Sequence, residues 1–579
     1  MAIFTFDASH ALGRVRAVDT RRVNLQVNTD EDLRKARVGQ LVALALPGAI
    51  EEWLIGIIDK VVKTPVLEEQ DIPENVSTDD LASIISPRES VLNTVQLTLV
   101  GTVSLTTDNK PHFSRSLVQV PEIDGTCHIL RDAQLQAFMN LLSTEGKTDH
   151  SLEIGRYTID ENAVAYLDGN KLFQRHASLL GSTGSGKSWS VAAILEQAAN
   201  LPSANLIVFD LHGEYRELSY ARHLRIPGPE ELGKSDDSLL FLPYWLLNAE
   251  ELQAMFIDRS EFSAHNQVMA FQDTVVTEKK KQLESLQKTD VLNAFTLDSP
   301  VPFSVENVIG ELKRMNEEMV PGSKGGTKQG VFYGQFSRLL VRLSSKISDK
   351  RYGFLFQAPS SAHEYDAMAS MIKRLMDYSE QKAQIKVINF SEVPADILPI
   401  IVGLVARIIY QVQFWTDRDK RKPMALVCDE AHMYLPKKEG KNPVEQRAIE
   451  NFEKIAKEGR KYGVALLIIS QRPSDVSPTI LSQCNNVVTL RLTNGDDQAT
   501  VRKLMPESLE GLMDTLPILD IGEALVVGDA VLLPSRIRIR PPKEKPLSAT
   551  IDFWDEWSKD PDTPDFAKAV ENMRRQNRA

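Results

Sequence analysis

The segment Gly181-Ser-Thr-Gly-Ser-Gly-Lys-Ser188 matches the pattern Gly-x-x-x-x-Gly-Lys-Ser/Thr at every position. Glycines let a backbone curl so that successive N–H groups point toward phosphate oxygens. In this pattern Lys187 reaches the β- and γ-phosphates, and the hydroxyl of Ser188 binds Mg²⁺. ATP and Mg²⁺ are therefore the expected cofactors. The predicted phosphate loop consists of Gly181, Ser182, Thr183, Gly184, Ser185, Gly186, Lys187 and Ser188.

The residues on either side of this loop support the same interpretation. Residues 177–180 are mostly apolar and have the length of a short strand, and residues 189–200 have a helix-forming composition. A helix that starts at the loop presents the positive end of its dipole to a bound anion. The strand–loop–helix order that the motif requires is therefore present. The alternative interpretation is a surface loop rich in glycine and serine.

The composition is that of a soluble protein with several domains. The 579 residues are 42% hydrophobic and 25% charged, and a chain of this length predicts three or four domains. The longest apolar run, residues 397–410, contains Arg407 and is shorter than the ~20 residues of a membrane span. The first residues lack a signal-peptide pattern, and the cysteines, Cys127, Cys428 and Cys484, lack metal-ligand spacing. We expect a cytoplasmic protein without disulfides and without a membrane partner.

The net charge of −12 argues against a surface coated for nucleic acid. It leaves room for DNA in a local basic groove or ring channel, because the phosphate contacts that matter are local. Basic loops supply candidates for such contacts, and solvated surface charge is the alternative interpretation of each. The candidates are Lys324, Lys328, Lys437, Lys438 and Lys441.

Residues 1–150 predict a small β-barrel or sandwich. Apolar and polar residues alternate with period two at 12–18, 23–27, 41–46 and 95–103, which is typical of short antiparallel strands. The acidic stretch 68–89 reads as an inserted loop. No cluster of catalytic residue types occurs in this region, so assembly or partner binding is its expected role.

The rest of the chain predicts an α/β core interrupted by helices. Apolar strands alternate with helices through residues 151–228 and 381–540, which implies a largely parallel, doubly wound sheet. Residues 229–380 show helical periodicity and read as an insertion, and residues 541–579 read as a peripheral arm. His212 and Glu214 follow the strand 205–210, and ligands bind at the carboxyl ends of the strands in such sheets. The alternative interpretation is that both are solvated turn residues.

A second set of polar residues completes the predicted site. The apolar run 424–428 leads into Asp429 and Glu430, a Walker B pattern in which Asp429 binds Mg²⁺ and Glu430 polarises the attacking water. Gln471 follows the next strand and is a candidate to order that water. Arg460 is either an arginine supplied across a subunit boundary or a cation at a helix C-terminus.

Taken together, these motifs resemble the HerA family, within the HerA/FtsK branch of RecA-like P-loop motor ATPases. The resemblance spans nearly the whole chain, including the β-rich start and the helical insertion. The matching segments are Gly-Ser-Thr-Gly-Ser-Gly-Lys-Ser at 181–188, Asp-Leu-His-Gly-Glu-Tyr at 210–215, Cys-Asp-Glu-Ala-His at 428–432, Glu-Gly-Arg-Lys-Tyr-Gly at 458–463 and Ser-Gln-Arg-Pro-Ser at 470–474.

The resemblance implies a homohexameric ring, a barrel of the kind found in ATP synthase subunits, and ATP-driven translocation or unwinding of double-stranded DNA. It also implies a partner enzyme docked on the barrel side. Family members commonly pair with the nuclease NurA, and bacterial relatives pair with sirtuin-like or nuclease effectors in antiphage defence. The family pattern also directs Arg175 at nucleotide phosphates, assigns Gln471 as a sensor and makes Arg460 a candidate trans-acting finger.

Two other functions remain open from the sequence. In a scaffold ring, ATP binding would hold the hexamer together so that it assembles and regulates an effector enzyme. A P-loop kinase acting on a small molecule is the weaker alternative, because the long spacing between the two Walker elements and the β-rich start argue against it. The leading hypothesis is a hexameric ATP-dependent DNA translocase that works with a nuclease-type or sirtuin-like effector in DNA processing or antiphage defence.

Overall fold

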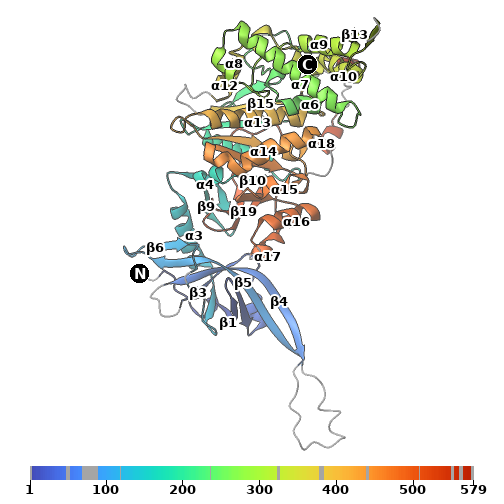
Figure 1. Cartoon of the computed structure of the whole chain (residues 1–579). Coiled ribbons are helices and arrows are strands. Elements are labelled where there is room, and N and C mark those ends of the chain that lie inside the picture. The colour runs from blue at the N-terminus through green and yellow to red at the C-terminus, as the bar shows by residue number, and fades with distance from the viewer. Residues whose placement is uncertain are drawn as a thin grey trace, which may run out of the picture. The chain divides into compact units, whose positions relative to one another are not determined.

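A computed structural model describes residues 3–46, 52–67, 89–117, 119–234, 236–322, 326–376, 384–437, 443–506, 509–548, 553–559 and 565–575. The chain forms two compact units (Figure 1). Unit 1 comprises Met1–Leu172, Ala177–Ser190 and Asn485–Pro541, and unit 2 comprises Phe173–His176, Val191–Cys484 and Pro542–Ala579. Nearly all of the predicted acidic insertion, together with Lys324, Lys438 and Lys441, lies outside the described residues.

Unit 1 contains a closed six-stranded barrel, drawn in blue in Figure 1. The strands follow the order β2-β1-β7-β3-β4-β5, and a second pairing of β2 with β5 closes the ring. Strand β6 extends the sheet beside β5. This confirms the barrel that the period-two alternation predicted. The strands are β1 (Ala11–Asp19), β2 (Arg22–Val27), β3 (Leu41–Ala45), β4 (Trp53–Leu67), β5 (Glu89–Leu105), β6 (Pro111–Ser114) and β7 (Thr126–Ile129).

The sequence explains both the core and the curvature of the barrel. In β2, Val23, Leu25 and Val27 are buried while the residues between them are not, so one face fills the interior. The pairing of β1 with β2 shifts between Val15 and Ala17, and such bulges bend and twist a strand. A Cβ on Gly13 would lie 2.5 Å from the carbonyl oxygen of Gln26, so β1 and β2 approach too closely there for any larger residue.

The remainder of unit 1 is a sheet in the order β10-β18-β19-β20-β8-β9. Strands β10 and β18 are parallel, and the other neighbours are antiparallel. The alternation of strands and helices had predicted a largely parallel sheet and did not specify the direction of β19. This strand is antiparallel because residues 491–522 return to the edge where β18 ends. The strands are β8 (Ser151–Tyr157), β9 (Asp160–Asp168), β10 (Ala177–Leu180), β18 (Asn486–Leu490), β19 (Glu523–Gly528) and β20 (Ser535–Ile539).

Helices accompany these strands of unit 1. The helix α3 (Asp132–Gly146) follows the barrel and buries Phe138, Met139 and Leu142. Two further helices, α16 (Gly495–Leu504) and α17 (Glu510–Met513), lie between β18 and β19 in the chain. The barrel is tied to this region, because the Asp59 carboxylate on β4 accepts a 2.7 Å hydrogen bond from the backbone N–H of Gly511.

Unit 2 contains a parallel sheet in the order β12-β15-β11-β16-β17. Its central strands are buried along their whole length, as expected for a sheet covered on both faces. This confirms the α/β core of the predicted RecA-like P-loop fold. The strands are β11 (Asn205–Asp210), β12 (Arg222–Arg225), β15 (Gln384–Asn389), β16 (Met424–Cys428) and β17 (Val464–Ser470).

Helices between β12 and β15 form the predicted insertion, coloured green to yellow in Figure 1. Their apolar positions form a core that includes Phe271, Leu312 and Leu343. A small hairpin of β13 (Met319–Pro321) and β14 (Thr327–Gln329) projects from it. The helices are α6 (Ala249–Phe256), α7 (Ala264–Ser285), α8 (Thr289–Ala294), α9 (Val305–Glu317), α10 (Ser337–Ser348), α11 (Gly353–Phe356) and α12 (Ala367–Met376).

The helix α13 (Leu398–Trp415) is the apolar run noted in the sequence, and it packs against α14 (Pro443–Tyr462). Contrary to expectation, its length and hydropathy are sufficient for a membrane span, but 72% of it is buried inside the fold. The Arg407 side chain on α13 makes a double ion pair with Glu251. A buried helix with such an anchored charge is a core helix.

Candidate nucleotide-binding site

In unit 1, the predicted phosphate loop connects β10 to α5 (Lys187–Ala198). Gly184 and Gly186 have φ of +72° and +105°, a backbone region that side chains rarely adopt. A Cβ on Gly181 would lie 2.6 Å from the Ser185 hydroxyl oxygen, so the loop closes tightly on itself there. The glycines are therefore where the curled backbone requires them.

Hydrogen bonds from distant parts of the sequence hold this loop in place. The Ser182 N–H donates to the carbonyl oxygen of Arg491 at 2.9 Å, and the Gly522 N–H donates to the carbonyl oxygen of Ser185 at 3.0 Å. Within the loop, the Ser185 hydroxyl donates to the carbonyl oxygen of Ser182 at 2.7 Å. Sequence reasoning did not identify Arg491 or Gly522 as supports of the loop. The only local indication was that Gly522 is an isolated glycine just before a strand.

The loop presents a cation at the start of a helix. Lys187 is only 8% exposed, and its Nζ donates to the carbonyl oxygen of Ser182 at 3.2 Å. Ser188 follows it in the first turn of α5, where backbone N–H groups lack acceptors within the helix. An ammonium group, a hydroxyl and a helix N-terminus together fit the phosphates of a nucleotide.

In unit 2, the two carboxylates of the Walker B pattern follow β16. The register pairs Phe209 of β11 with Cys428 of β16, so Asp210 and Asp429 come next on neighbouring strands. Burial raises the pKa of Asp429 well above its ordinary value, and the negative charges of Glu430, Glu214 and Asp210 raise it further. A divalent cation would offset this repulsion, so the donor set fits Mg²⁺.

Asp210 has a different role from its neighbour. Its Oδ1 accepts hydrogen bonds from the backbone N–H groups of His212, Gly213 and Glu214, and its Oδ2 accepts one from Tyr215, at 2.8 to 3.3 Å. It therefore holds the loop after β11 in place. His212 is exposed, as the turn interpretation predicts, whereas the partly buried Glu214 contributes to the field at Asp429.

Glu430 adopts an unusual conformation for a glutamate. Its φ is +45°, in the left-handed region, and its side chain is only 9% exposed. Its carboxylate lies 3.3 Å from Nδ1 of His432, which is also 3.4 Å from the hydroxyl of Ser470. Such strain persists only where the surrounding structure enforces it, and it is concentrated at functional sites. His432 and Ser470 were not assigned a role from the sequence.

Gln471 emerges at the same edge of the unit 2 sheet. Strand β17 is parallel to β16 and pairs Ile468 with Cys428, so continuing this register sets Ser470 level with Glu430. Gln471 follows directly and is partly buried. Within unit 2 the structure thus brings Asp429, Glu430 and Gln471 to the ends of adjacent strands.

Arg460 and Arg175 lie at the opposite edge of this sheet. Arg460 is exposed in the last turn of α14, just before β17 begins. His176, next to Arg175, accepts a 3.0 Å hydrogen bond from the Leu466 N–H and lies 3.0 Å from the carbonyl oxygen of Ala456. A seven-residue strand spans roughly 20 Å, so neither arginine reaches the carboxylates after β16 in the same unit.

Among the residues that the structure describes, no group of three or more His, Cys, Asp or Glu side chains is arranged to hold a metal ion. This agrees with the way Mg²⁺ is bound in nucleotide sites, by one or two protein oxygens together with phosphates and waters. Ser188 in unit 1 and Asp429 in unit 2 are the predicted protein ligands.

Comparison with known proteins points to one family. The model of the helicase HerA central domain matches residues 152–409. The chain is 24% identical to the DNA double-strand break repair helicase HerA of Saccharolobus solfataricus over 563 residues, which cover 94% of this chain and 96% of the relative. It is 27% identical to the helicase of the same name from Pyrococcus furiosus over 423 residues, which cover 67% and 69% of the two chains. The solved structure of VirB4 of Thermoanaerobacter pseudethanolicus covers 68% of this chain and 97% of its own, with 17% identity and a TM-score of 0.45.

Proposed function

We propose that this chain, which belongs to the HerA family of P-loop ATPases, is an ATP-driven DNA translocase or helicase that works as a homohexameric ring. The carboxylate arrangement after β16 is the observation that carries the proposal, because a buried, mutually repelling set of acids is costly unless it serves a cation. Two relatives named as DNA double-strand break repair helicases, one of which aligns with 94% of this chain, supply the substrate class.

In this proposal the phosphate loop and the carboxylates act on the same ATP molecule. Lys187 would hold the β- and γ-phosphates, and Ser188 and Asp429 would hold Mg²⁺, which neutralises phosphate charge when bound. The Glu430 carboxylate, which lies 3.3 Å from Nδ1 of His432, would polarise the attacking water. Gln471 would order the same water from the neighbouring strand.

The position of the two arginines supports a role in the neighbouring subunit. Arg460 and Arg175 lie at the edge where the strands of unit 2 begin, away from the carboxylates of their own unit. In a ring, this edge would face the next subunit's nucleotide, where a guanidinium stabilises charge on the transferred phosphoryl group. Arg460 also suits the end of α14 as a cation at a helix C-terminus, which is the competing explanation.

Mixing two inactive variants separates these explanations. Glu430→Gln subunits retain Arg460, and Arg460→Ala subunits retain Glu430. If Arg460 acts across the subunit boundary, mixed rings regain ATPase activity, because some interfaces combine an intact Glu430 with an intact arginine. A mixture of Glu430→Gln with the double variant should stay inactive. No recovery in the first mixture would remove the trans-acting role.

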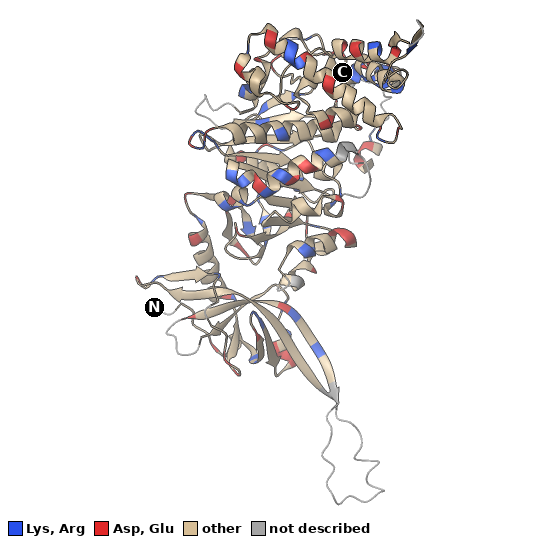
Figure 2. Ribbon diagram, in the orientation of Figure 1, with Lys and Arg blue, Asp and Glu red and all other residues tan. Residues whose placement is uncertain are grey.

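In this proposal DNA contacts a few basic loops and not a uniformly basic surface. Figure 2 shows basic and acidic residues interspersed along most elements, in keeping with the net charge of −12. Lys437 is exposed soon after the Walker B carboxylates, and its backbone N–H donates to the carbonyl oxygen of Asp475 at 2.7 Å, which ties that loop to the residues after β17. A loop in this position would respond to the nucleotide state.

The first test is ATP turnover with and without linear duplex DNA, on protein whose mass in solution is measured in parallel. We expect a hexamer that duplex DNA stimulates. Glu430→Gln should abolish turnover, whereas Glu450→Gln, on the surface of α14, should not. Reversing Lys437 and Lys438 to glutamate should weaken stimulation and spare basal turnover, with Lys280→Glu on α7 as the control.

A hexamer whose turnover is indifferent to DNA would contradict the translocase. It would favour the alternative, a scaffold ring that ATP holds together to assemble and regulate an effector. The partner in either case is proposed to be a nuclease-type or sirtuin-like enzyme on the barrel side, in DNA processing or antiphage defence. Under the scaffold alternative, Glu430→Gln should preserve assembly with that effector.

A further inference from the structure

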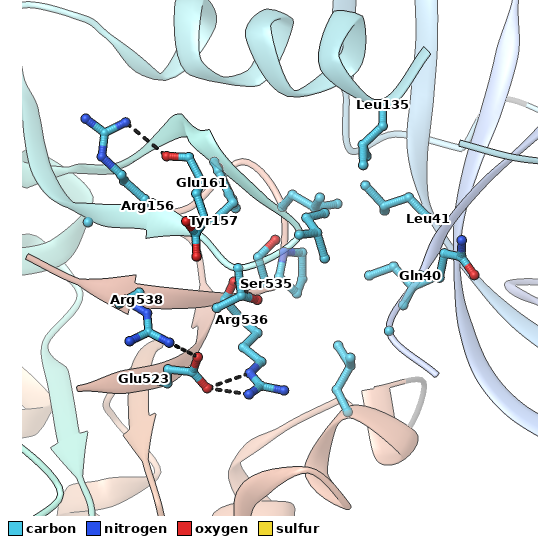
Figure 3. A pocket seen from close by; sticks show the side chains of 18 of the residues that line it. Gln40, Leu41, Leu135, Arg156, Tyr157, Glu161, Glu523, Ser535, Arg536 and Arg538 are labelled. Carbon is cyan, nitrogen blue, oxygen red and sulfur yellow. Dashed lines mark hydrogen bonds and ion pairs between the residues drawn. The ribbon is translucent and has the colours of Figure 1, made fainter. Parts of the chain in front are cut away.

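Unit 1 contains a large cavity that the ATPase reaction does not use. Its volume is about 1200 Å³, and it lies between the barrel and the strands β8 and β20. Figure 3 shows lining residues from the barrel side, Gln40, Leu41 and Leu135, across from Arg156 and Arg538 of β8 and β20. The predicted phosphate-loop residues 181–188 are not among those that line it.

The lining carries an excess of positive charge, because three glutamates face six arginines. One glutamate is fully engaged: Glu523 accepts hydrogen bonds from Arg536 and from Arg538, the latter at 2.9 Å. Burial by itself raises the pKa of Glu523. The hydrogen bonds from Arg536 and from the Asp520 backbone N–H, together with the charges of Arg536 and Arg538, outweigh burial and lower the pKa, so this carboxylate stays ionised. The arginines are Arg37, Arg131, Arg156, Arg536, Arg538 and Arg540.

Two of these arginines, Arg131 and Arg156, form no ion pair with a carboxylate among the residues that the structure describes. The Nε and Nη2 atoms of Arg131 are buried and have no hydrogen-bond partner. Arg156 donates to the backbone carbonyl oxygens of Glu161 and Asn162, at 3.1 and 3.2 Å, and these groups carry no net charge. Arg156 is exposed, whereas the two buried nitrogens of Arg131 lack acceptors. A buried donor without an acceptor is costly, so the retention of Arg131 points to an anionic ligand.

The rest of the lining is apolar. Leu41, Leu130 and Leu533 are buried at the cavity wall, and the ring of Tyr157 lies beside them in the lining. Ligand sites for small molecules combine such walls with a few placed polar groups. A nucleic-acid backbone would gain little from leucine side chains, whereas a nucleotide has both an apolar ring and phosphates.

We propose that this cavity binds a small phosphate-bearing ligand of the nucleotide class, at a site separate from the phosphate loop. The phosphates would accept hydrogen bonds from the guanidinium group of Arg131, whose forked geometry suits them. The base would pack on the leucine wall. This proposal does not depend on DNA translocation.

The cavity is connected to the phosphate loop within unit 1. Glu523 lines the cavity, and its neighbour Gly522 donates the hydrogen bond to Ser185 of the loop. A ligand that moved Arg536 or Arg538 would therefore displace a support of the ATP site. The occupied cavity thereby changes the affinity of the loop for ATP, and the effect is reciprocal.

Binding is tested in a Lys187→Ala background, which weakens the phosphate loop. ADP is titrated into the full-length variant by calorimetry, with inorganic tripolyphosphate and duplex DNA as competitors. We expect residual binding of about one ADP per chain, which tripolyphosphate displaces. Adding Arg131→Met should weaken it at least about tenfold, corresponding to ~1.4 kcal/mol. Arg14→Met, an exposed barrel arginine outside the cavity, should have no effect.

A second variant guards against a folding defect in Arg131→Met. Gln40→Trp fills the cavity from the barrel side without removing a charge, and it should also abolish residual ADP binding. The proposal is wrong if residual binding is absent, or if it survives both Arg131→Met and Gln40→Trp. Displacement of ADP by duplex DNA but not by tripolyphosphate would also overturn it, in favour of a DNA path through the cavity.

Discussion

The backbone N–H of Gly522 donates a 3.0 Å hydrogen bond to the carbonyl oxygen of Ser185, in the centre of the phosphate loop. Gly522 has φ of +78°, and a second hydrogen bond joins its own carbonyl oxygen to the N–H of Ile539 on β20. The conformation of the nucleotide loop thus depends on the residue that precedes β19.

Replacing Gly522 by alanine should therefore impair ATP binding. Nothing lies within 4 Å of the added Cβ, so the cost is the left-handed backbone, on the order of 1–2 kcal/mol. We expect the KM for ATP to rise by about tenfold. Gly495→Ala is the control, since it also has open space but an ordinary φ. Equal kinetics for the two variants would refute a role for the Gly522 contact.

Neutralising Asp429 and Asp210 should have opposite effects on stability. Asp429→Asn removes a charge that burial and neighbouring acids disfavour, so without nucleotide the melting temperature should rise. Burial also raises the pKa of Asp210, but Asp210→Asn replaces an oxygen that accepts backbone N–H groups with an amide donor, and this loss should dominate at ~1–3 kcal/mol. Thermal unfolding of both variants, with and without Mg²⁺-ATP, measures this. A lowered melting temperature for Asp429→Asn would contradict the assigned repulsion.

Breaking the ion pair between Arg407 and Glu251 should destabilise unit 2 strongly. The two side chains are 10% and 1% exposed, and their two hydrogen bonds measure 2.9 and 2.7 Å. Glu251→Gln leaves a buried guanidinium without its counter-charge, which should lower the free energy of unfolding by ~3–5 kcal/mol. Adding Arg407→Met should recover part of it. Urea unfolding is the measurement.

The control for that pair is Glu250→Gln. Glu250 pairs with Arg447 but its side chain is 53% exposed. Its loss should change the free energy of unfolding by no more than about 0.5 kcal/mol. A similar loss for Glu250→Gln and Glu251→Gln would mean that burial does not decide the cost.

Lys279 should give the helical insertion a pH-dependent stability. Burial lowers its pKa to about 8 from 10.5, while its Nζ donates to the carbonyl oxygens of Leu297 and Ser299 at 2.7 and 2.8 Å. Between these two pKa values the unfolded chain binds more protons than the folded chain, so the free energy of unfolding rises with pH. Below about pH 8 Lys279 is protonated in both states, and its contribution does not change with pH.

The measurement is urea unfolding of the protein and of Lys279→Met from pH 7 to 10. The stability of the unsubstituted protein should increase relative to that of Lys279→Met above about pH 8, by at most ~1.4 kcal/mol per pH unit. Lys280→Met, at the exposed neighbouring position, should track the unsubstituted protein throughout. A constant difference from Lys279→Met over the whole range would show that Lys279 does not titrate in this window.

Local pattern predicted much of the fold. The alternation in 23–27 predicted β2, and the apolar run 205–210 predicted β11 with the same bounds. The alternation predicted β2 because only one of its faces is buried, and the continuous apolar run predicted β11 because both of its faces are buried. Local pattern left the direction of β19 open, since strand direction depends on where the preceding connection ends. The apolar run 397–410 is also shorter than α13, because the helix continues beyond it to Trp415.

The sequence by itself determined the phosphate loop, the Walker B acids and the strand–helix order, because short-range chemistry requires those residue types at those spacings. Only the tertiary structure decided which distant groups complete them. It placed Asp210 beside Asp429, tied Gly522 to Ser185, and set Arg460 at the opposite edge of its sheet from the carboxylates. It also gathered six arginines around one cavity. The physical reason is that strand register and chain return bring together residues far apart in sequence, and no local pattern encodes those distances.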